Sequence, residues 1–175
     1  AVRPCNSQPM EKIASFRINH LTLMPGIYES RIDDFGNGQV ATTFDIRMTA
    51  PNRQPALSIG ALHAMEHIVA TWLRNHPRWR DRIVYWGPMG CCTGNYLIVK
   101  GHPHPDEIRT VSMTINAALR GSGNTRIAMT TNVTSSVLNI CGNYLLMSLP
   151  EARMAAEAYL KVLRDPQCPL KYPME

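Results

Sequence analysis

Residues 27–48 read IYESRIDDFGNGQVATTFDIRM, two strand-like runs on either side of a glycine-rich turn. The runs, Ile27 to Asp34 and Val40 to Met48, carry the β-branched and aromatic residues that strands favour. Between them, the Asn37-Gly38 pair supplies the positive backbone φ angles that a tight hairpin turn requires. The segment therefore predicts an antiparallel β-hairpin.

Beyond the hairpin, the chain alternates between helical and strand-like patterns. Apolar residues recur at helical spacing after Ser58, and this pattern ends near Asn75, before Pro77. The later patterns predict two strands, Arg82 to Trp86 and Tyr96 to Lys100, and two helices, Pro105 to Leu119 and Ser148 to about Arg164.

The last predicted helix begins with Ser148-Leu149-Pro150-Glu151, in which a serine three residues before a glutamate is typical of a capping box. Helices and strands mix along the chain without a strict βαβ alternation. The predicted fold class is therefore α+β, an antiparallel β-sheet with helices packed on one face.

Length and composition limit the classes of protein that the chain can represent. Its 175 residues suit one domain, and its net charge of +5 comes from basic residues that are scattered along the sequence, which argues against a nucleic-acid partner. A membrane-spanning helix needs about 20 consecutive apolar residues, and the sequence contains no such run. Met10 is a candidate start, so we interpret residues 1–9 as an N-terminal extension or cloning remnant and 10–175 as the single domain. An odd number of cysteines, five, favours reduced thiols in the cytoplasm.

The sharpest chemical motif is His63-Ala64-Met65-Glu66-His67. At 100° per residue, His63 and His67 lie about 40° apart on a helix and one turn displaced, so both imidazoles can reach one metal ion. Glu66 lies beside them, where it can act as a base without binding the ion. This order of residues also occurs in inverted zinc proteases, and a pair of half-buried histidines without a metal is an equally reasonable interpretation of five residues alone.

A catalytic metal usually has three protein ligands and an open position, so the third ligand has to come from elsewhere in the chain. Cysteine is a strong candidate, and Cys91, Cys92 and Cys141 all lie near glycines or turns. Taken singly, each is more often a small buried hydrophobic residue. A second thiol close to the cation could serve as an acid or a base near neutral pH.

Five separated blocks resemble the S-ribosylhomocysteine lyase family, LuxS, and together they span about residues 14–160. One short block would be weak, but five in the family order are specific. The blocks are Ala14-Ser15-Phe16-Arg17-Ile18-Asn19-His20; Phe44-Asp45-Ile46-Arg47 with Pro51-Asn52; His63 to His67; Pro88-Met89-Gly90-Cys91 with Thr93-Gly94; and Cys141-Gly142-Asn143-Tyr144 with Ser148-Leu149 and Ala152-Arg153.

The resemblance implies a LuxS-like fold and a lyase that cleaves the thioether of S-ribosylhomocysteine to homocysteine and dihydroxypentanedione, an autoinducer precursor in quorum sensing. It implies no organic cofactor, and a metal, Fe(II) with zinc or cobalt as substitutes. It also implies a cytoplasmic homodimer with active sites at the interface, and no nucleic-acid or membrane partner. The implied residues are His63, His67 and Cys141 as metal ligands, Cys91 and Glu66 as general acids and bases, and Ser15, His20 and Arg47 in the substrate pocket.

Some positions depart from the family pattern, and these leave pocket polarity and rate open. They are Asn19, Tyr85, Gly87, Cys92 and Met147. Two other functions share the same motif: an HxxEH-type zinc metallopeptidase, which leaves Cys91 without a role, and a non-catalytic metal-binding module, in which Cys91 or Cys92 is a fourth ligand.

Overall fold

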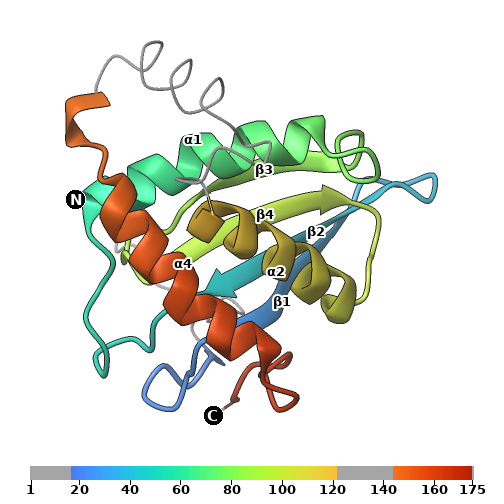
Figure 1. Ribbon diagram of the computed structural model, residues 1–175. Helices are drawn as coiled ribbons and strands as arrows, with labels where there is room; N and C mark the ends of the chain where they lie inside the picture. Colours follow the sequence, from blue (N-terminus) through green and yellow to red (C-terminus); the bar gives the residue numbers. More distant parts are fainter. Residues whose placement is uncertain (1–16, 122–143, 175) are drawn as a thin grey trace, which may run out of the picture.

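A computed structural model of the chain describes residues 17–121 and 144–174. Its centre is a four-stranded antiparallel sheet in the order β1-β2-β4-β3 (Figure 1). Each predicted strand is confirmed to within two residues of its ends. The strands are β1 (Gly26–Asp34), β2 (Val40–Arg47), β3 (Ile83–Pro88) and β4 (Gly94–Lys100).

The hairpin that opens the sheet is confirmed in register and in its turn. Strand β1 pairs with β2 from Asp34 opposite Val40 to Gly26 opposite Arg47. Three consecutive turn residues have positive φ, with Asn37 at 53° and Gly38 at 73°. The Asn-Gly pair therefore acts as predicted, because these residues tolerate the left-handed region that other side chains disfavour.

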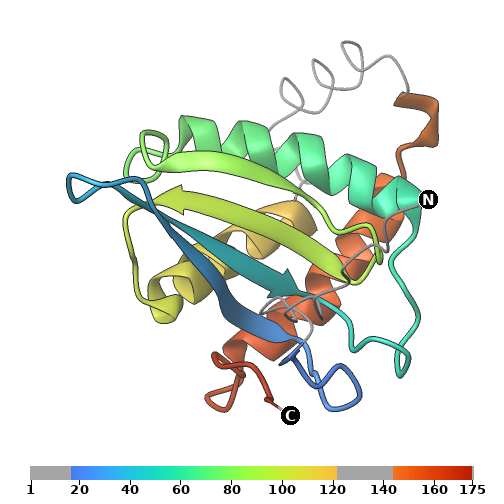
Figure 2. The same ribbon diagram turned by 180° about the vertical axis from the view of Figure 1, so that it is seen from behind.

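The long helices among the described residues cover one face of the sheet, and Figure 2 shows the other face with none of these helices over it. This arrangement confirms the α+β class. The helices are α1 (Ile59–Asn75), α2 (Pro105–Gly121) and α4 (Leu149–Arg164), and a short 3-10 helix, η2 (Tyr144–Leu146), precedes α4. Within the described residues, no helix has the length and apolar character needed to cross a membrane.

The predicted cap of α1 is confirmed, but the predicted capping box of α4 is wrong. The Ser58 hydroxyl accepts a hydrogen bond from the backbone N of Ala61 at 3.1 Å. Helix α4 does begin after Ser148, yet the Ser148 side chain makes no capping hydrogen bond. Glu151 instead accepts a hydrogen bond from the Ser58 hydroxyl. Packing of α4 against α1 thus gives Glu151 a distant partner in place of the local one.

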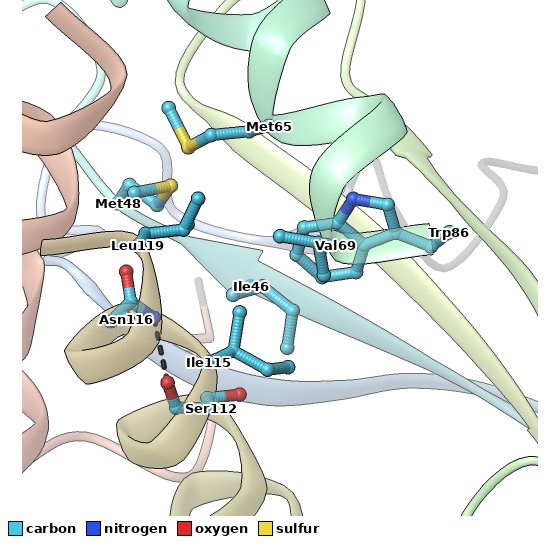
Figure 3. A pocket seen from close by; sticks show the side chains of 9 residues that line it. All are labelled: Ile46, Met48, Met65, Val69, Trp86, Ser112, Ile115, Asn116 and Leu119. Atoms are coloured by element: carbon cyan, nitrogen blue, oxygen red, sulfur yellow. Dashed lines mark hydrogen bonds between the residues drawn. The ribbon is translucent and has the colours of Figure 1, made fainter. Parts of the chain in front are cut away.

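The core lies between the sheet and the three helices, and it holds one small cavity of about 10 Å³ (Figure 3). Helix α1 contributes Met65 and Val69 to its wall, and α2 contributes Asn116, whose amide donates to the backbone oxygen of Ser112 at 2.8 Å. Met65 and His63 are two residues apart on α1, about 160° around the helix. The imidazoles of the predicted metal site therefore point away from this cavity.

The face of the sheet that no helix covers is called the outer face below. Side chains alternate along a strand, so Asp45 and Arg47 lie on the outer face, while Ile46 between them packs in the core. Tyr85 and Tyr96 lie on the same outer face and are 45% and 37% exposed. The outer face thus carries partly exposed tyrosines beside a buried pair of charged side chains.

Candidate functional site

Helix α1 presents the predicted metal-binding residues. The rings of His63 and His67 have centroids 5.0 Å apart and are tilted by 54°, and Glu66 lies between them in sequence. All three side chains are half-buried. Two imidazoles one helical turn apart fit a divalent transition metal as two of its ligands.

The third predicted ligand, Cys141, lies outside the described residues, as do Ser15 and the segment 1–9. Within the part of the chain that is described, no three His, Cys, Asp or Glu side chains gather closely enough to hold a metal ion. The structure therefore brings together two of the three predicted ligands and leaves the third untested.

The chain that follows Cys141 nevertheless returns to the start of α1. The backbone N of Ser148 donates to the carbonyl oxygen of Gly60 at 2.9 Å. A Cβ at Gly60 would meet the carbonyl oxygen of Leu146 at 2.6 Å, so glycine is required for this close approach. Gly60 is three residues before His63, so the described segment that leads into α4 packs beside the end of α1 that carries the imidazoles.

A second group of functional side chains, called the thiol cluster below, consists of Cys91, Thr93, Arg47 and Asp45. Cys91 lies in the loop between β3 and β4, with its Sγ 3.0 Å from Thr93 Oγ1 and 3.6 Å from Arg47 Nη1. Arg47 also donates to Thr93 Oγ1 and, through Nη2, to Asp45 Oδ2 at 2.5 Å. The cluster joins a reactive sulfur to a buried ion pair.

The loop holds Cys91 through a tight turn. The backbone N of Cys92 donates to the carbonyl oxygen of Met89 at 2.9 Å, and the N of Met89 donates to that of Gly94 at 3.0 Å. Cys92 has a φ of 57°, in the left-handed region, so the turn carries the strain one residue after the thiol. Cys91, Cys92 and Cys168 are all free thiols.

The surroundings of Cys91 shift the balance between thiol and thiolate. Partial burial raises its pKa, but the hydrogen bonds from Thr93 and the charge and hydrogen bond of Arg47 outweigh that effect, so the pKa is lowered overall. A thiolate is the nucleophilic and basic form of cysteine. The lowered pKa therefore favours the form of Cys91 that can accept a proton.

Arg47 is charged and buried, only 6% exposed, and Asp45 beside it is 1% exposed. Burial raises the pKa of Asp45, while Arg47, Tyr172 and His20 each oppose that rise. His20 itself is exposed, and its Nδ1 lies 2.8 Å from the backbone oxygen of Ile18. The structure therefore brings His20 and Arg47, two predicted substrate-binding residues, to the same end of the sheet.

Sequence reasoning assigned no role to Asp45, Thr93 or Tyr172. The alternation of a strand could have paired Asp45 with Arg47, because they are two residues apart on one face of β2. Tyr172 Oη donates to Asp45 Oδ2 at 2.8 Å across 127 positions of sequence, and no local pattern indicates such a contact.

Two of the residues that depart from the family pattern, Tyr85 and Gly87, are in contact with each other. A Cβ at Gly87 would overlap the hydroxyl oxygen of Tyr85. The tyrosine side chain therefore fills the space that a side chain at position 87 would take. Asn19 forms a turn, in which its Oδ1 accepts from the backbone N of Leu21 at 3.1 Å.

Comparison with known proteins gives a consistent result. A model of the family described as S-Ribosylhomocysteinase (LuxS) matches residues 13–167. The chain is 49% identical to the S-ribosylhomocysteine lyase of Phocaeicola vulgatus over 152 residues, 86% of this chain and 89% of that protein. It is 41% identical to that of Borreliella afzelii over 166 residues, 94% of this chain and 100% of that protein. The chain belongs to the S-ribosylhomocysteinase (LuxS) family.

Proposed function

We propose that this chain cleaves the thioether of S-ribosylhomocysteine to give homocysteine and dihydroxypentanedione, the precursor of an autoinducer. The family and the names of its relatives support the substrate. The structural observation that carries the proposal is Cys91 Sγ, held 3.0 Å from Thr93 Oγ1 and 3.6 Å from Arg47 Nη1. A metallopeptidase mechanism would not use the Cys91 thiol.

The reaction needs proton transfers rather than a net oxidation or hydrolysis. A carbonyl has to move along the ribose until it lies β to the sulfur, and each shift takes a proton from one carbon and returns it to the next. Cys91 carries these protons as a thiolate, which its lowered pKa favours at neutral pH. Glu66 handles the hydroxyl protons and the proton removed in the final elimination.

The proposed metal ligands are His63, His67 and Cys141, and the proposed metal is Fe(II), which zinc or cobalt can replace. The two imidazoles on α1 support this set, and a thiolate ligand would complete the three that a catalytic site needs. A bound divalent metal supplies Lewis acidity that stabilises negative charge on sugar oxygens. The role of the chain is to fix the imidazoles on one helix and to keep Glu66 beside them.

Ser15, His20 and Arg47 form the proposed substrate-binding set. Arg47 and His20 both lie close to Asp45, at the end of the sheet that carries Cys91. Arg47 Nη2 contacts Asp45, and its Nη1 contacts Thr93 Oγ1 and Cys91 Sγ, so a polar group of the substrate would bind Arg47 by replacing one of the Nη1 contacts. We therefore assign Arg47 a double role, in binding and in the ionisation of Cys91.

The outer face of the sheet is the proposed homodimer interface. Tyr96 and Ile98 on the central strand β4 lie on this face beside Tyr85. Tyrosines and aliphatic groups of this kind are enriched where proteins associate. A dimer formed here would place the thiol cluster of each subunit close to the partner, as shared active sites require.

The dimer is tested by sedimentation or light scattering of the Ile98→Lys variant. A charge on the outer face should shift the protein toward the monomer, because a buried unpaired charge opposes association. Leu145→Lys is the matched control, since Leu145 is 83% exposed on η2, away from the sheet. Equal masses for Ile98→Lys and the unchanged protein would exclude this face.

A cytoplasmic location completes the proposal. The three described cysteines are free, and Cys91 has to stay a reduced thiol to carry protons. A reducing compartment preserves that state.

The decisive experiment measures homocysteine, detected with a thiol reagent, after S-ribosylhomocysteine is added to anaerobically purified protein. Release of one homocysteine per substrate, without cleavage of a casein control, supports the lyase. No release from protein that contains stoichiometric metal would overturn the proposed function. Casein cleavage would favour the metallopeptidase instead.

A further inference from the structure

The C-terminal segment after α4 returns to the sheet and reaches the thiol cluster. It ends beside the start of β1 (Figures 1 and 2), where the backbone N of Ile27 donates to the carbonyl oxygen of Pro169 at 3.0 Å. Tyr172 in this segment stacks on Tyr28 of β1, with ring centroids 4.7 Å apart and planes within 9° of parallel. The ring is thus held by stacking, and its hydroxyl group has a fixed position.

That hydroxyl is directed at the ion pair behind the thiol. Tyr172 Oη donates to Asp45 Oδ2 at 2.8 Å, and Arg47 Nη2 donates to the same oxygen at 2.5 Å. Arg47 Nη1 then lies 3.6 Å from Cys91 Sγ. A continuous chain of hydrogen bonds therefore runs from the C-terminal segment to the sulfur.

The rest of the ion pair offers little other support. Asp45 Oδ1 and Arg47 Nε are buried, and neither has a hydrogen-bond partner among the residues that the structure describes. The orientation of the guanidinium therefore depends on Asp45 Oδ2 and Thr93. Because Asp45 Oδ2 accepts from Tyr172 as well, a change at Tyr172 reaches Arg47 through one shared atom.

We propose that Tyr172 is a positioning residue for the Cys91 thiol, which acts through Asp45 to hold the Arg47 guanidinium against the sulfur. The catalytic meaning of this arrangement rests on the proposed role of Cys91 in proton transfer. The arrangement itself is tested on the thiol alone. Among the described residues, Arg47 on β2 and Tyr96 on β4 are titratable groups that interact with Cys91, Thr93 is its hydrogen-bond partner, and Tyr172 contacts the cluster through Asp45.

The test is the rate at which iodoacetamide alkylates Cys91 in the metal-loaded protein between pH 5 and 9, with the labelled residue identified by mass spectrometry. In Tyr172→Phe, stacking on Tyr28 is kept, and the hydrogen bonds of the hydroxyl group with Asp45 and with Ser30 are lost. We expect alkylation of Cys91 at pH 7 to slow by about two- to tenfold and its pH midpoint to rise, because less of the thiol is ionised. The value of kcat should fall by a similar factor, and KM should rise as well, because Arg47 is also a proposed substrate-binding residue.

The matched control is Tyr28→Phe, which removes a hydroxyl from the other ring of the same stack. Tyr28 Oη donates to the backbone oxygen of Met24 at 2.7 Å and has no bond to Asp45. A pH profile of Tyr172→Phe that equals the unchanged protein, or an equal shift in Tyr28→Phe, would overturn the proposal. A purely structural role for Tyr172 would lower the melting temperature without moving the profile.

The alkylation rate of Cys91 in Asp45→Asn gives a second test, which does not require Tyr172→Phe to fold. The direction of the rate change decides between two explanations. If Asp45 acted on Cys91 only through its charge, removing that charge would ionise the thiol more easily and speed alkylation. If Asp45 positions Arg47, alkylation slows. Faster alkylation in Asp45→Asn contradicts the proposal. If alkylation slows as expected but the unchanged protein releases no homocysteine, only the proposed function is contradicted.

Discussion

The face of α1 that carries His63 and His67 and the thiol cluster on the outer face of the sheet are built in different ways. The two imidazoles come from one helical turn, and their mutual position follows from the geometry of the helix alone. The thiol cluster instead draws its members from β2 and from the loop before β4, and Tyr172 of the C-terminal segment contacts it through Asp45. Replacing one histidine should therefore abolish metal binding on α1. In the thiol cluster, by contrast, replacing a distant residue should change the position of Arg47 relative to Cys91 and so change the ionisation of the thiol.

The largest expected effect is at the local site. His67→Ala should lose the bound metal and reduce lyase turnover by at least about a thousandfold, because a ligand of a Lewis-acid metal contributes several kcal/mol. Metal content measured by atomic emission checks the first effect, and homocysteine release checks the second. His76→Ala, just after the same helix, is the control and should retain metal. Stoichiometric metal in His67→Ala would remove this residue from the ligand set.

A somewhat smaller effect is expected at the sulfur. Cys91→Ala should retain metal and lose at least about 10²-fold in turnover, the usual contribution of a general acid or base. Cys92→Ala is the matched control, since the described contact of its Sγ is with the backbone oxygen of Gly90, at 3.8 Å, whereas Cys91 Sγ contacts Arg47. If Cys92→Ala lost turnover and Cys91→Ala kept it, the assignment of the reactive thiol would be wrong.

The same contrast explains how much of the fold the sequence could predict. The hairpin and α1 were predictable because their signals are local: Asn37-Gly38 sets the turn and Ser58 caps the helix. The place of β4 between β2 and β3 depends on pairing over about 50 residues, for which the sequence has no comparable signal. The capping box at Ser148 failed for this reason, because Glu151 has a partner in α1.

The candidate site divides in the same way. The spacing of His63 and His67 predicted their proximity, and the structure confirms it. Asp45 and Tyr172 were missed, because a contact across 127 positions is created only when the C-terminal segment packs on the sheet. Cys141 and Ser15 remain predictions, since both lie outside the described residues.

A moderate effect is expected when the orientation of the thiol cluster is disturbed without loss of charge. Arg47→Lys replaces a guanidinium, which contacts Asp45 through Nη2 and Cys91 through Nη1, with a single ammonium group. The ammonium keeps the charge but cannot make both contacts with the same geometry. The pKa of Cys91 is lowered partly by Arg47, so it should rise, and alkylation at pH 7 should slow by about three- to tenfold. Arg31→Lys, on exposed β1, is the control. An unchanged pH profile would show that charge alone sets the pKa.

The smallest expected effect concerns the pair of departures on β3. Gly87→Ser forces the Tyr85 ring to move, because its hydroxyl oxygen overlaps the new Cβ position. The change should lower the free energy of unfolding by about 1 kcal/mol. Urea denaturation measures this, and Gly90→Ser, with no described atom within 4 Å of its Cβ position, should change little. In Tyr85→Asp/Gly87→Ser the cost should largely disappear, since the shorter side chain frees the space. Strict additivity of the two changes would mean that Tyr85 and Gly87 are independent, and that the outer face tolerates each replacement separately.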